Sequence, residues 1–60
     1  MEYRTNYIKD IEQGEVLANL GQIQNITEYA NCWIVTVKTQ DDLIMAMKYP
    51  KSKILITVHE

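Results

Sequence analysis

Residues 32–38 read CWIVTVK, a run rich in the β-branched and aromatic residues that are typical of a β-strand. Successive side chains of a strand point to opposite sides, so Trp33, Val35 and Val37 share one side. The other side includes Lys38. We therefore expect the side that carries Trp33 to face the core.

The next segment predicts a helix that begins at Thr39 and ends at Pro50. The Thr39 hydroxyl can cap the first turn, where Asp41 and Asp42 suit the positive end of the helix dipole. Residues 43–49 then carry an apolar stripe with helical spacing. Pro50 ends the helix because the residue before a proline avoids the α conformation.

Residues 54–59 read ILITVH and alternate like the first run, which predicts a second strand. Its core side would hold Ile54, Ile56 and Val58. Together with the preceding segments, this strand completes a strand–helix–strand unit over residues 32–59.

The first half of the chain allows two interpretations. In the favoured one it forms a strand, a helix and a second strand, over residues 3–8, 10–20 and 22–29. Gly21 would close the helix, and a turn at Ala30 and Asn31 would pair the second strand with the CWIVTVK strand. In the rival interpretation, residues 15–30 form one helix with a single apolar stripe.

The favoured order is β-α-β-β-α-β, which predicts an α+β fold: a small ferredoxin-like mixed sheet with two helices on one face. Sixty residues make one domain at most, so we expect residues 1–60 to be a single domain and a whole small protein. A chain this short has a marginal core and often needs a disulfide, a metal or a partner subunit. The single cysteine excludes an internal disulfide, and with the single histidine it is too little for a structural zinc site.

Charge and hydropathy exclude several classes of protein. The net charge of -2 argues against a dedicated nucleic-acid-binding protein, which usually has a basic face. No apolar run is long enough for a transmembrane helix, and the first residues do not have the pattern of a signal peptide. We therefore expect a cytoplasmic protein.

The sequence carries no catalytic or cofactor signature. Cys32 and His59 could pair for nucleophilic catalysis. Both lie in predicted strands, however, where we expect the cysteine to act as a small apolar side chain. Glu12 and Glu15 could act as an acid–base pair, but they fit the solvated face of the first helix better. We expect no enzyme activity, no cofactor and no metal.

One lysine cluster surrounds an aromatic residue. Lys48, Lys51 and Lys53, together with Tyr49, could contact phosphate groups and stack a base. Arginine, which binds phosphates in a fork and reads bases, occurs only at Arg4. This cluster supports an alternative function, a small dimeric nucleic-acid-binding regulator.

Apolar residues outside the predicted core indicate a protein partner. Ile34 and Leu55 fall on the open side of the predicted sheet, and Met45 and Tyr49 fall outside the stripe of the second helix. We expect these four residues to contact a partner. A second copy of the chain would cover the open side most simply, so we expect a homodimer.

The order of elements in residues 33–58 resembles that of small bacteriophage inhibitor proteins, such as podophage inhibitors of host RNA polymerase. The likeness lies in an alternating strand, a Thr-x-Asp-Asp cap, an apolar helix and a second strand. The partner-contacting charges of that family do not map onto this chain, so the resemblance implies no site residues. It implies a compact, non-catalytic protein that binds and blocks a host macromolecule. The predicted function is therefore a protein–protein interaction module, with the nucleic-acid regulator as the alternative.

Overall fold

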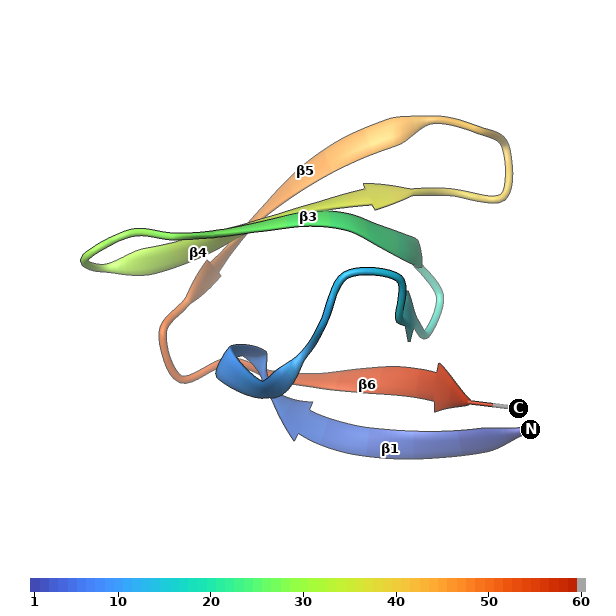
Figure 1. Ribbon diagram of the computed structural model, residues 1–60, viewed down its shortest axis with the longest axis horizontal. Coiled ribbons are helices and arrows are strands. Elements are labelled where there is room, and N and C mark those ends of the chain that lie inside the picture. Colours follow the sequence, from blue (N-terminus) through green and yellow to red (C-terminus); the bar gives the residue numbers. More distant parts are fainter. Residues whose placement is uncertain (60) are drawn as a thin grey trace.

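The computed structural model describes residues 1–59, and these form six β-strands and one short 3₁₀-helix (Figure 1). The elements are, in chain order, β1 (Glu2–Tyr7), η1 (Ile8–Asp10), β2 (Val16–Leu17), β3 (Gly21–Glu28), β4 (Cys32–Lys38), β5 (Ile44–Pro50) and β6 (Ile54–His59). The predicted α+β fold is therefore wrong. The described residues form an all-β fold.

The strands make one open antiparallel sheet in the order β1-β6-β2-β3-β4-β5. The sheet bends over itself, so that β1 and β6 lie on one side of the molecule and β3, β4 and β5 lie on the other (Figure 1). We call the concave side of the sheet its inner side and the convex side its outer side. Within residues 1–59, β1 and β5 are the two edges of the sheet.

The core lies on the inner side and draws on both parts of the sheet. Val35 and Val37 of β4 are completely buried, which confirms the side predicted for this strand. Trp33 lies on the same side and is partly buried against the core. The buried apolar residues are Ile8, Ile11, Leu17, Ile23, Val35, Val37 and Leu55.

The predicted helix between Thr39 and Pro50 is a β-hairpin instead. Thr39 donates its backbone N–H to the Leu43 carbonyl at 2.8 Å, and its hydroxyl accepts the Leu43 N–H at 3.2 Å. Asp42 adopts a left-handed conformation with φ of 62°, which aspartate tolerates in turns. The hydroxyl that was predicted to cap a helix therefore closes the turn between β4 and β5.

The predicted helix over residues 10–20 is also wrong, and so is the rival helix over residues 15–30. Among residues 1–59, only Ile8–Asp10 are helical, in η1. Ala18 donates its N–H to the Ile56 carbonyl at 2.9 Å, so the β2 region completes the sheet beside β6. The predicted hairpin is confirmed as β3 and β4, which pair through a turn that contains Ala30 and Asn31.

The strand predicted over residues 54–59 is confirmed as β6, but its two sides are reversed. Leu55 and Thr57 point into the core, with 7% and 0% of their surface exposed. Ile54 and Ile56 are each 49% exposed on the outer side. Alternation defines the two sides of a strand but does not decide which one the rest of the chain covers.

Candidate functional site

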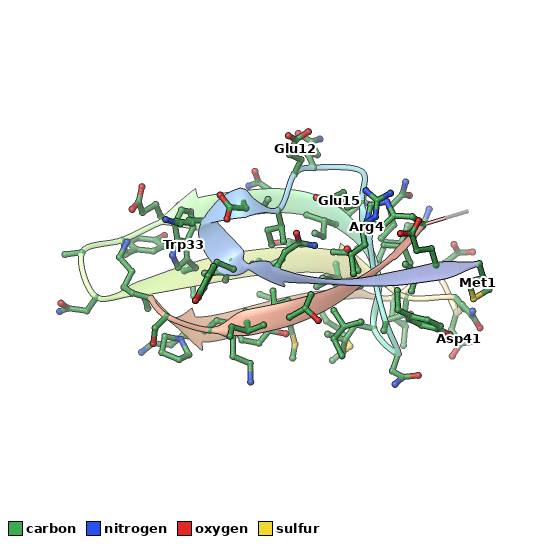
Figure 2. All side chains as sticks on the ribbon, turned by 90° about the horizontal axis from the view of Figure 1, so that it is seen from below. Met1, Arg4, Glu12, Glu15, Trp33 and Asp41 are labelled. Carbon is green, nitrogen blue, oxygen red and sulfur yellow. The ribbon has the colours of Figure 1, made fainter. Side chains whose placement is uncertain are left out.

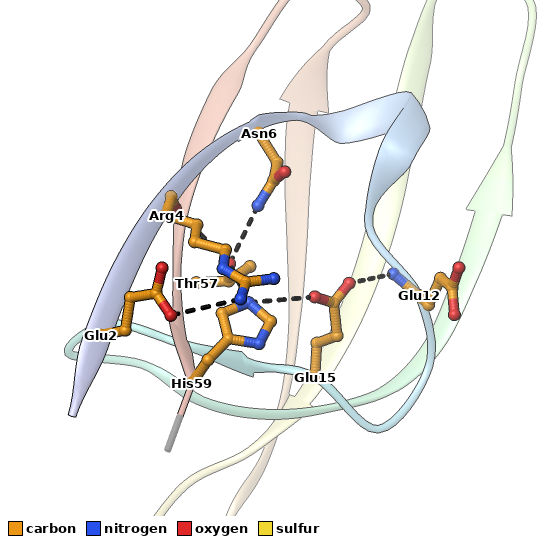
Figure 3. A network of polar contacts seen from close by, with 7 residues as sticks. All are labelled: Glu2, Arg4, Asn6, Glu12, Glu15, Thr57 and His59. Carbon is orange, nitrogen blue, oxygen red and sulfur yellow. Dashed lines mark hydrogen bonds and ion pairs between the residues drawn. The ribbon is translucent and has the colours of Figure 1, made fainter.

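A polar cluster occupies the inner side between β1, β6 and the segment before β2 (Figure 3). The buried Thr57 hydroxyl lies 2.8 Å from His59 Nε2 and accepts a hydrogen bond from Asn6 Nδ2 at 2.9 Å. Glu15 Oε2 lies 3.5 Å from the same His59 nitrogen. The Glu15 carboxylate also accepts the backbone N–H of Glu12 at 2.6 Å.

This cluster does not have the geometry of a nucleophilic site. A catalytic histidine contacts its nucleophile with one ring nitrogen and its orienting carboxylate with the other. Here Thr57 and Glu15 both approach Nε2 of His59, and the hydroxyl is completely buried. The cluster therefore satisfies a buried hydroxyl and fastens the loop before β2 to β6.

The charged pair beside this cluster is exposed. Arg4 donates to a Glu2 carboxylate oxygen at 3.2 Å, and this hydrogen bond lowers the pKa of Glu2. Both side chains are more than half exposed, so solvent screens the pair.

The Cys32–His59 pair considered from the sequence is not formed. Cys32 lies on the outer side of β4 and His59 lies on the inner side of β6, with β2 and β3 between these strands. Among residues 1–59, no group of three or more histidine, cysteine, aspartate or glutamate side chains could hold a metal ion.

The lysine cluster is partly engaged within the fold. Lys51 lies 2.8 Å from the Glu28 carboxylate and 4.7 Å from the centre of the Trp33 ring. Lys53 lies 6.0 Å from the centre of the Tyr49 ring. Lys48 is exposed in β5. Trp33, which Lys51 covers, lies at one end of the molecule, and Asp41 lies at the opposite end (Figure 2).

The four predicted partner contacts are separated by the fold. Leu55 belongs to the core, so its predicted place on an open side is wrong. Ile34 is partly buried on the outer side of β4. Met45 and Tyr49 share the inner side of β5, where Met45 is 43% exposed and burial raises the pKa of Tyr49. Strand alternation, and not helical spacing, brings these two residues to the same side.

The β5 edge is the first candidate binding surface. It consists of the backbone groups of Ile44–Pro50 that face away from β4, with the side chains beside them. Within residues 1–59, no strand pairs with this side of β5. Ile44 is 60% exposed, and Leu43 before it is 59% exposed.

A second candidate surface was not predicted from the sequence. It lies on the outer side of β1, β2 and β6, and we call it the outer patch. Its members are Tyr3, Tyr7, Val16, Ile54, Ile56 and Val58. The sequence signal for this surface is the alternation of residues 54–58, but alternation alone predicts Ile54, Ile56 and Val58 to face the core.

In comparisons with known proteins, no family model, no curated protein and no solved structure matches this chain. In residues 1–59, no helix has the length and apolar character needed to cross a membrane.

Proposed function

We propose that the protein is a non-enzymatic interaction module that binds an extended segment of another protein along the β5 edge. The observation that supports this most directly is the length and regularity of that edge. All seven residues of β5 pair with β4 without a register shift. A regular, unpaired strand of this length is a template for an added strand.

The hydrogen bonds of the hairpin identify the backbone groups that face outwards. Thr39 and Leu43 are hydrogen-bonded across the hairpin, and in an antiparallel ladder every second residue is hydrogen-bonded to the neighbouring strand. The backbone groups of Met45, Met47 and Tyr49 therefore face β4. The intervening residues turn their N–H and C=O groups away from β4. These residues are Ile44, Ala46 and Lys48, followed by Pro50, which has no N–H.

The side chains of β5 favour a partner segment of mixed chemistry. On the inner side, Met45 and Met47 offer adaptable apolar contacts beside Tyr49. On the outer side, Lys48 is the single charged residue of the strand. In a matching segment, every second residue would be apolar and would face the methionines. The segment would also carry an acidic residue near Lys48.

Such a contact would cover a segment of the partner and prevent other proteins from binding to that segment. A small module can block a larger protein in this way without any chemistry of its own. The proposal therefore keeps the predicted binding function and the predicted contacts Met45 and Tyr49, and it moves them from a helix to a sheet edge.

The test is Ala46→Pro, which removes the central outward N–H of β5. Proline is tolerated where the N–H of an edge strand faces solvent, so the variant should fold. Peptides of about ten residues, long enough to match a strand, are selected from a random library on the wild-type protein. Their affinity is then measured by fluorescence anisotropy. We expect Ala46→Pro to weaken binding at least about tenfold, as expected for a lost hydrogen bond and a steric clash.

The matched control is Thr5→Pro. The Ile8 N–H donates to the Lys53 carbonyl. By the same alternation, Tyr3, Thr5 and Tyr7 turn their backbone N–H and C=O groups away from β6, at the opposite edge of the sheet. Thr5→Pro should leave peptide affinity unchanged. Selection of no peptide, or equal binding by the wild type and Ala46→Pro, would contradict the proposed function.

A further inference from the structure

The outer patch is the more apolar of the two sides of β6, although nothing in residues 1–59 covers it. On the inner side, β6 places Leu55, Thr57 and His59. On the outer side it places two isoleucines and a valine, and both isoleucines are 49% exposed. A strand that faces water on one side normally turns its polar residues outwards. The reversed pattern of β6 is the pattern of a strand that is covered on both sides.

The neighbouring strands extend this surface. Tyr3 of β1 and Val16 of β2 both lie beside Val58, and they are 62% and 40% exposed. Tyr7 lies beside Ile54 and is 54% exposed. The outer patch is therefore continuous across three adjacent strands.

The six side chains of the outer patch carry no formal charge, and one ammonium group, that of Lys9, lies at its edge, 5.9 Å from the centre of the Tyr7 ring. The charged residues of β1, Glu2 and Arg4, lie on the inner side of that strand, and so does His59 of β6. On the outer side of these strands, the described residues are the patch itself and the neutral Thr5. The patch side chains offer no ion pair to a charged partner, whereas a second copy would bring an equally apolar and uncharged set of side chains.

We propose that a second copy of this chain covers the outer patch in a two-fold symmetric dimer. The contact would be of the sheet-on-sheet kind, with the two patches packed face to face. From the exposed fractions, and side-chain areas of roughly 150–250 Å² for the tyrosines, each patch offers about 500 Å². Two copies would bury up to about 1,000 Å² in total, which is the lower limit for a biological interface and fits a dimer that forms at high concentration. The tyrosine hydroxyls can stay hydrated at the rim.

This dimer leaves the β5 edge free, because β5 is the opposite edge of the sheet from β1. A dimer would thus present two binding edges. The inference does not depend on the proposed function, and each can fail alone.

The experiment is sedimentation equilibrium on the full chain, from micromolar to millimolar concentration. The variant is Ile56→Lys, which places two ammonium groups in the dimer contact. The wild type should change from the monomer mass of 7.0 kDa to twice that mass as its concentration rises. Ile56→Lys should weaken this association at least about a hundredfold, because an unpaired charge is buried at great cost. Tyr29→Lys is the matched control, because Tyr29 is 53% exposed and belongs to neither candidate surface, and it should associate like the wild type.

A wild type that stays monomeric at millimolar concentration would overturn the proposal, and so would an unchanged dimer in Ile56→Lys. Should Ile56→Lys not fold, isotope-filtered NMR on a mixture of labelled and unlabelled wild type decides. Contacts between the Ile54 or Ile56 methyls of one copy and the Tyr3 or Tyr7 ring of the other support the dimer. Contacts between copies that involve β5 alone would overturn it.

Discussion

At the scale of single residues, Thr57 is buried although it is polar, and its neighbour Ile56 is half exposed. The Thr57 hydroxyl has Asn6, His59 and the Arg4 carbonyl within hydrogen-bonding distance. A hydroxyl with partners costs little to bury, whereas an unsatisfied one costs about 1–3 kcal/mol. The polar cluster around Thr57 is thus what permits β6 to turn its isoleucines outwards.

Gly21 is a second residue whose identity the fold requires. Its φ is 152°, and a Cβ atom there would lie 2.2 Å from the Lys38 carbonyl oxygen. Gly14 has φ of 95°, but a Cβ atom there would meet nothing within 4 Å. We predict that Gly21→Ala lowers the free energy of unfolding by about 3 kcal/mol or more, through overlap and strain. Gly14→Ala should cost about 1 kcal/mol, through backbone strain alone.

Urea unfolding followed by Trp33 fluorescence would measure both free energies of unfolding. A domain of this size has a total stability of about 3–9 kcal/mol, so Gly21→Ala should remove roughly a third of that stability or more. Equal effects at the two glycines would show that the contact with Lys38 does not matter.

At the scale of elements, the hairpin of β4 and β5 shows why a short apolar run misleads. Residues 43–49 fit a helical stripe, and they also alternate as Ile44, Ala46 and Lys48 against Met45, Met47 and Tyr49. Periodicity cannot choose between the two in so short a run. Pairing with β4 along the whole of β5 decided the outcome, and this pairing is a tertiary interaction that local propensity does not contain.

Thr39 closes the turn of the hairpin formed by β4 and β5, where its hydroxyl accepts the Leu43 N–H at 3.2 Å. We predict that Thr39→Ala lowers the free energy of unfolding by about 1 kcal/mol, the usual worth of one such bond. Thr39→Ser keeps the hydroxyl and should cost clearly less. Urea unfolding gives both values, and the exchange rate of the Leu43 amide reports the bond directly. An equal loss in both variants would instead assign the effect to the threonine methyl group.

Strands with strong β-branched content were predictable, and those that depend on distant pairing were not. β4, β6 and the hairpin of β3 and β4 follow from local composition and a turn. β2 contains only Val16 and Leu17, and it exists because it bonds to both β3 and β6. The sequence groups Met45 with Tyr49, but on a helix, whereas the fold places them on one side of β5. The outer patch was not predicted, because its strands meet only in the folded sheet.

At the scale of the whole molecule, the two candidate surfaces lie at opposite ends of the strand order. The outer patch covers β1, β6 and β2, and the β5 edge is the last position of the sheet. The charged residues of β1 and His59 of β6 lie on the inner side, so association through the outer patch brings none of them into direct contact. One small sheet can therefore support self-association and partner binding at once.

The same charge distribution predicts that nucleic acid does not bind at physiological salt. Lys51 is the lysine most fully engaged within the fold, because Glu28 lies 2.8 Å away and Trp33 lies below its ammonium group. A lysine paired in this way must give up its carboxylate partner before it contacts a phosphate, and the acidic chain repels the phosphate backbone as a whole. Fluorescence anisotropy with labelled single-stranded and duplex oligonucleotides, at about 0.15 M salt, should show no binding.

Glu28→Gln is the informative variant, because it frees Lys51. This variant should bind oligonucleotides weakly at low salt and should not bind them at about 0.15 M salt. A sub-micromolar affinity of the wild type, lost in Lys51→Glu with Lys53→Glu, would instead make the lysine cluster a phosphate site. It would also favour the nucleic-acid regulator over the interaction module.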